Sequence, residues 1–227
     1  MITRSKLKKL LVIIGRENLH KDSGIYTPLF SNFKVIFDPS DELAIQYEKV
    51  ISFGERIALA KGLVRRIYST FLKLRFMLKY RDWKGHYFQL FKPHYRDFEY
   101  RKAILHHFFS TLKPKYKVIV VGRSAGALLA TQLADEFQFE HVICLGYPFK
   151  DHDLPDEPYR TEHLAHLKTP TTIYQGTQEV YGRPSELDNY KLSKNIQIIG
   201  VDSDHDYALN TADLTKITRQ LNELLKD

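Results

Sequence analysis

The chain is poor in cysteine and tryptophan and has no long apolar run, and these shortages limit what it can be. One of its 227 residues is cysteine, so Cys144 cannot form an intrachain disulfide, and a reducing compartment is expected. Cys144 lies in an apolar run, where we expect a buried, inert thiol. No run is long enough to span a bilayer, and residues 10–14 are too short and lack the cleavage site of a secretory signal. These absences predict a soluble, cytoplasmic protein.

Basic residues are concentrated in one stretch. The formal net charge is +7. Residues 61–92 hold nine basic residues against one acid, Asp82, so this stretch accounts for the whole excess. Such a distribution argues against a general polyanion binder and for one local basic surface.

A Gly-x-Ser-x-Gly pattern at residues 122–126 lies between a predicted strand and a predicted helix. Residues 117–121 are apolar and mostly β-branched, and residues 127–134 favour helix. A serine at such a sharp turn projects its hydroxyl above the sheet, and the glycines avoid collisions with strand and helix. We interpret Ser124 as a nucleophile; the alternative is a glycine-rich turn with an incidental serine. The N–H of Ala125, at the start of the helix, is the predicted oxyanion donor.

Strands and helices alternate along the chain. The predicted strands are residues 10–14, 33–37, 117–121, 141–145, 171–175 and 195–201, and helices are predicted at about 97–112 and 211–225. This alternation predicts an α/β fold, with a doubly wound, mostly parallel sheet and helices on both faces, as one domain over residues 1–227. Catalytic groups should then lie at the carboxyl ends of the strands.

Residues 42–96 are a helical, basic and aromatic insertion, which we interpret as a cap. Apolar residues at alternating spacings of three and four form a stripe along it: Val64, Ile67, Phe71, Leu74 and Leu78. The simplest expectation is that the stripe packs inward and the charges are solvated. Alternatively, the insertion accepts an acyl chain, or residues 61–92 contact an anionic membrane surface. Nucleic-acid binding is not expected, because no recognised binding module is present.

His205 is the predicted general base. It is the only one of the ten histidines between the last predicted strand and the last predicted helix, where a Ser–acid–His chain order requires the base. The alternative is a histidine that caps a loop.

Glu179 is the predicted acid, because it follows the strand at residues 171–175 at the expected position of the orienting carboxylate. Asp202, Asp204 and Asp206, on either side of His205, are competitors for that role. Their alternate spacing could suggest a cation, but acids within one turn are usually solvated or capping, so no metal site is expected.

Beyond these single residues, an ordered series of motifs resembles the small α/β-hydrolases of the dienelactone-hydrolase-like group, which includes the testis-expressed-30 and KANSL3-type proteins. The resemblance covers about residues 117–207. It implies a Ser–acid–His triad, which falls on Ser124, Glu179 and His205, and an α/β-hydrolase fold. The motifs are residues 122–126, 145–148, 160–164, 169–171, 175–179 and 204–205.

We therefore expect a serine hydrolase that acts on a small-molecule ester or thioester through an acyl-enzyme, with no metal and no cofactor. The expected second oxyanion donor is the backbone N–H of Arg16, and the expected substrate contacts are Arg123, Tyr147 and Trp83. The alternative is a non-catalytic protein of the same fold that binds a partner or an anionic membrane through the basic insertion. The sequence predicts neither the acyl group nor the oligomeric state.

Overall fold

The structure is a computed structural model, and it describes residues 7–15, 24–39, 98–151, 153 and 157–226, with six helical residues between 67 and 78. The chain divides into two compact units, one made of residues 1–38 and 109–227 and the other of residues 39–108. The sheet and the described residues of the candidate site belong to the first unit.

Six parallel strands form one sheet in the order β2-β1-β3-β4-β5-β6. The chain adds β2 on one side of β1 and then β3 to β6 on the other, so the direction of winding reverses next to β3. Ligands of open parallel sheets bind at such reversal points, beyond the carboxyl ends of the strands. The strands are β1 (Lys8–Ile14), β2 (Val35–Phe37), β3 (Tyr116–Arg123), β4 (His141–Leu145), β5 (Thr171–Gly176) and β6 (Ile196–Val201).

The central strands are buried on both faces, which explains why their sequences are runs of apolar residues without alternation. Their register brings the carboxyl ends together: Gly122 of β3 pairs with Ile14 of β1 and with Cys144 of β4. The Cys144 thiol is free and buried, and burial raises its pKa. This confirms the expected inert cysteine.

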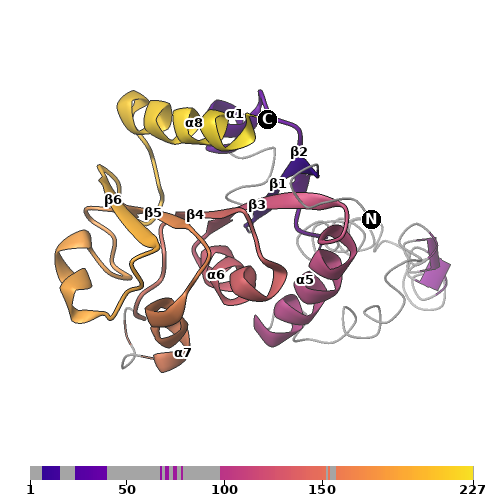
Figure 1. The fold of residues 1–227 in the computed structure, drawn as a ribbon, viewed down its shortest axis with the longest axis horizontal. Helices are drawn as coiled ribbons and strands as arrows, with labels where there is room; N and C mark the ends of the chain where they lie inside the picture. The colour runs from indigo at the N-terminus through magenta and orange to yellow at the C-terminus, as the bar shows by residue number, and fades with distance from the viewer. Residues whose placement is uncertain are drawn as a thin grey trace. The chain divides into compact units, whose positions relative to one another are not determined.

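Helices cover both faces of the sheet (Figure 1): α1 and α8 lie over one face, and α6 lies over the other. Together with the parallel sheet, this confirms the predicted fold class. The helices are α1 (Tyr26–Phe30), α5 (Phe98–Leu112), α6 (Ala125–Phe137), α7 (Pro158–Thr161) and α8 (Thr211–Leu225), with 3-10 turns η4 (Glu162–His166) and η5 (Pro184–Asn189).

The closing helix α8 begins and packs as the sequence predicts. The Asn210 side chain accepts a hydrogen bond from the N–H of Asp213 and so caps the first turn. Ile217 and Leu221 are fully buried in the main apolar cluster, beside Leu11 of β1. Burying each such side chain contributes about 2 kcal/mol, so this face fixes α8 against the sheet.

The predicted cap falls almost entirely outside the described residues, and it stays a prediction. Four members of its apolar stripe are described, and all four are exposed, so they do not show the expected inward packing: Ile67, Phe71, Leu74 and Leu78. Trp83 and the rest of the aromatic cluster lie outside the described residues. In the part of the chain that is described, no helix combines the length and the apolar character needed to cross a bilayer.

Candidate active site

Ser124 occupies a strained turn between β3 and α6. Its φ is 50° and its ψ is −122°, a left-handed backbone conformation that costs a residue with a Cβ about 1–3 kcal/mol. The two glycines of the pattern explain how the turn is packed. A Cβ added to Gly126 would lie 2.3 Å from the carbonyl oxygen of Ile14, and one added to Gly122 would lie 2.6 Å from that of Gly126. The helix therefore starts in backbone contact with β1 and β3.

The amino end of α6 is able to stabilise negative charge. The Ser124 carbonyl accepts hydrogen bonds from the N–H groups of Ala127 (2.8 Å) and Leu128 (3.2 Å), which closes the first turn. Ala125 is the first helical residue, so the helix itself provides no acceptor for its N–H. That donor and the positive end of the helix dipole are available beside the serine.

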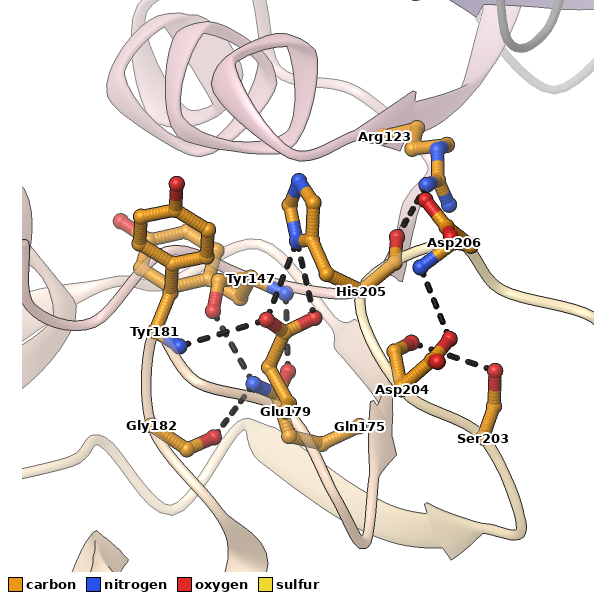
Figure 2. A network of polar contacts seen from close by, with 10 residues as sticks. All are labelled: Arg123, Tyr147, Gln175, Glu179, Tyr181, Gly182, Ser203, Asp204, His205 and Asp206. Carbon is orange, nitrogen blue, oxygen red and sulfur yellow. Dashed lines mark hydrogen bonds and ion pairs between the residues drawn. The ribbon is translucent and has the colours of Figure 1, made fainter. Parts of the chain in front are cut away.

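Glu179 and His205 form a hydrogen-bonded pair. The Nδ1 atom of His205 lies 3.0 Å from Oε1 and 3.2 Å from Oε2 of Glu179 (Figure 2). The Glu179 residue is only 2% exposed, and its Oε1 also accepts the N–H of Tyr181 at 3.2 Å. A buried carboxylate with two donors can fix both the tautomer and the orientation of the imidazole.

The loop that carries Glu179 is held to the chain that follows β6. The N–H of Gln178 donates to the Ser203 carbonyl at 3.1 Å, and the N–H of Glu179 donates back to Gly176 at 3.2 Å. An added Cβ at Gly176 would lie 2.4 Å from that same Ser203 carbonyl, so glycine permits the two segments to approach. These main-chain bonds set the acid opposite the histidine.

The His205 imidazole has one engaged and one open edge. Its side chain is 37% exposed, and its ring packs against Tyr181 with centroids 4.6 Å apart. Nε2 lies on the side of the ring turned away from Glu179 (Figure 2). Neither Nε2 nor the Ser124 hydroxyl takes part in the hydrogen bonds found among the described residues, and catalytic contacts of this kind commonly tighten only when substrate binds.

Gly146, directly after β4, connects the serine to the acid. Its carbonyl accepts the N–H of Ser124 at 3.0 Å. Its φ is +69°, and an added Cβ would lie 3.3 Å from Oε2 of Glu179. One glycine therefore touches the main chain of the serine on one side and the carboxylate on the other, which places Ser124, Glu179 and His205 at the same edge of the sheet.

The competing aspartates have other partners. Asp204 Oδ1 accepts the N–H of Asp206 at 2.9 Å, a local turn, and Asp202 Oδ1 is 3.5 Å from the amide of Gln178. None of the three contacts the His205 ring among the described residues, where only Glu179 does. Within the same residues, no group of three or more His, Cys, Asp or Glu side chains is arranged to hold a metal ion.

The residues expected to touch substrate are placed differently. Tyr147 is fully buried, and its hydroxyl donates to the carbonyl of Arg160. Arg123 is 4% exposed, and its guanidinium donates to the main-chain carbonyl of His205 (Figure 2). Trp83 and Arg16, the expected second oxyanion donor, lie outside the described residues.

Three residues at the site were not predicted from the sequence: Gly146, Gln175 and Tyr181. The Gln175 amide clamps two loops, because it exchanges hydrogen bonds with the main chain of Tyr147 and donates to the Gly182 carbonyl at 2.6 Å. A polar residue that is fully buried in a central strand is the signal that could have identified Gln175. The contacts of Gly146 and Tyr181 join separate strands and loops, so no local pattern marks them.

Comparison with known proteins agrees with this geometry. A family model described as an alpha/beta hydrolase domain matches residues 93–227, more than half of the chain. No curated protein matches the sequence. A protein of the alpha/beta hydrolase superfamily from Xanthomonas campestris is 14% identical, with 96% of this chain aligned to 98% of that one and a TM-score of 0.55.

Two further solved structures are similar. A YdeN-like protein from Pectobacterium atrosepticum is 13% identical over 96% of this chain and 94% of its own, with a TM-score of 0.51. XC6422 from Xanthomonas campestris, an α/β serine hydrolase without a lid, is 14% identical with a TM-score of 0.44, and this chain spans 58% of its length while 56% of this chain is aligned. The narrower dienelactone-hydrolase-like grouping stays a prediction. From its strand order and its family match, the chain belongs to the alpha/beta hydrolase family.

Proposed function

We propose that this chain is a serine hydrolase that cleaves a carboxylic ester or thioester through Ser124, His205 and Glu179. The observation that carries the proposal is the bond between the buried Glu179 carboxylate and Nδ1 of His205, at the sheet edge where Ser124 occupies a strained strand-to-helix turn. Serine is a weak nucleophile without a base, and a histidine needs an orienting group to act as one.

In the first step, Nε2 of His205 takes the proton of the Ser124 hydroxyl as its oxygen attacks the acyl carbon. The carbonyl π bond becomes an oxyanion, which the N–H of Ala125 stabilises from the end of α6. The tetrahedral intermediate then collapses, the bond to the alcohol or thiol breaks, and the imidazolium returns its proton to the leaving group. The serine is left as an acyl ester.

In the second step, His205 takes a proton from water, and the hydroxide oxygen attacks the acyl-enzyme. Collapse of the second intermediate breaks the bond to Ser124 Oγ, which recovers the proton from the imidazolium. Glu179 remains ionised throughout and stabilises the positive imidazole in both steps. A loss of charge at Glu179 would therefore slow both steps.

Turnover of simple acyl compounds tests this proposal. We expect the purified chain to hydrolyse p-nitrophenyl acetate, butyrate or octanoate, or acetyl-coenzyme A, at least about 10⁴-fold faster than buffer, since oxyanion donors and binding alone give about 10³–10⁴-fold in triad-deficient hydrolases. The control is the same protein unfolded in guanidinium, which reports reaction at surface lysines and histidines. No turnover of any of these compounds by folded protein would favour the alternative, a non-catalytic protein of the same fold.

A further inference from the structure

Arg123 is a buried cation at the end of β3, immediately before Ser124. Its Nη2 donates to the main-chain carbonyl of His205 (Figure 2). Its Cζ lies 5.1 Å from the centroid of the Tyr207 ring, a cation–π distance. The arginine thus connects the strand that presents Ser124 to the loop that carries His205.

Stability alone does not explain a charge at this position. In the part of the chain that is described, no carboxylate lies within ion-pair distance of the Arg123 guanidinium, and its buried Nε has no hydrogen-bond partner. Burial lowers the pKa of the guanidinium, while Tyr207, Glu179 and the two nearby aspartates act in the opposite direction. Buried charges without close partners are expensive, and an apolar residue of similar size is often tolerated as well or better.

The His205 loop has few other long-range supports. Tyr207 has a φ of 62°, and its hydroxyl donates to the Tyr174 carbonyl at 2.7 Å, which anchors the end of the loop to β5. Between these points, the printed main-chain bonds at Asp204 and Asp206 are local to the turn. Arg123 contacts both the His205 carbonyl and the Tyr207 ring, so one side chain restrains the two residues that determine where the imidazole lies.

We propose that Arg123 is a positioning residue, which holds the His205 main chain and the Tyr207 ring so that the imidazole stays within reach of Ser124. This inference rests on the proposed function, and it replaces the expectation that Arg123 contacts substrate. The role requires a planar fork that donates a hydrogen bond and stacks on a ring at the same time. Lysine keeps the charge but does not provide that combination.

Kinetics of Arg123→Met and Arg123→Lys on p-nitrophenyl butyrate test the proposal. We expect Arg123→Met to lower kcat by about 10–100-fold, because small displacements of a catalytic group cost about that much, with KM within about threefold of wild type. We expect Arg123→Lys to recover part of the loss. The Tm of Arg123→Met should be within about 3 °C of wild type or higher, since a costly buried charge has been removed.

The matched control is Arg160→Met. Arg160 is another largely buried arginine, but its guanidinium pairs with Asp151 at 3.2 Å and with Glu157, away from His205. We expect this variant to lose stability and to keep kcat within about twofold of wild type. The contrast separates loss of a buried arginine from loss of the contact to the histidine loop.

A kcat of Arg123→Met within twofold of wild type would overturn the inference, as would a raised KM at unchanged kcat, which would indicate substrate contact. If Arg123→Met does not fold, Arg123→Lys decides by the same criteria. If wild type shows no turnover, the proposed function fails separately, and the Nδ1–H proton resonance of His205 then decides. We expect Arg123→Met to shift or broaden that resonance through loss of the Glu179 contact, and an unchanged resonance would contradict positioning by Arg123.

Discussion

Replacing Ser124 by alanine will lower kcat for an acyl ester by about 10⁴–10⁶-fold, the largest effect expected from any single substitution in this chain. The variant lacks the only atom that forms the acyl-enzyme, while the Ala125 donor and the end of α6 stay in place. Residual turnover should come from binding and oxyanion stabilisation alone. Steady-state kinetics on the best substrate of the acyl series measures the loss.

Ser124→Gly is the matched control for folding. It removes the same hydroxyl and also the Cβ that is strained at a φ of 50°. Both variants should be inactive, and the glycine variant should have a Tm equal to or above that of the alanine variant, because glycine adopts left-handed conformations without the steric cost. Turnover by either variant above about 1% of the wild-type kcat would mean that another residue is the nucleophile.

Replacing Glu179 by glutamine will lower kcat by about 10³–10⁴-fold, because a neutral amide neither stabilises the imidazolium nor favours the tautomer with a proton on Nδ1. The substitution preserves shape, and the amide oxygen can still accept the Tyr181 N–H that now bonds to Oε1 at 3.2 Å. The fold should therefore survive. We expect KM to change little, since Glu179 is buried behind the histidine and does not face substrate.

The control for this substitution is Glu186→Gln. Glu186 lies in η5, where it accepts the Arg183 N–H and pairs with Lys150 at 2.9 Å. Those donors hold the pKa of the Glu186 carboxyl below its usual value, so the change removes a favourable charge but does not touch the candidate site. We expect kcat within about twofold of wild type. Equal kcat values for the two glutamine variants would remove Glu179 from the mechanism.

Much of the fold could be predicted from local sequence. The apolar runs of β3, β4 and β5 and the stripe of α8 bury most of their side chains, and burial on both faces of a parallel sheet leaves a direct record in composition. The closing helix, residues 211–225, has the predicted bounds because Asn210 caps its start.

The site could be predicted only as far as chain order carries it. Ser124, Glu179 and His205 each follow a strand, and parallel strands bring their carboxyl ends to one edge. The burial of Arg123 against the His205 loop could not be predicted in this way, because it depends on the path of a loop 82 residues further along the chain. A charged residue after a strand is more often a ligand contact or a solvated group, which is why sequence reasoning assigned Arg123 to substrate.

Reaction with a fluorophosphonate, followed by intact mass of wild type, Ser124→Ala and His205→Ala, tests the central claim most directly. A phosphonate adds only to a serine whose proton a base can take, so the measurement does not depend on knowing the natural substrate. We predict one adduct on wild type and none on either variant. A folded wild-type protein that takes up no adduct, or an adduct that persists in Ser124→Ala, would contradict the proposed role of Ser124 and His205.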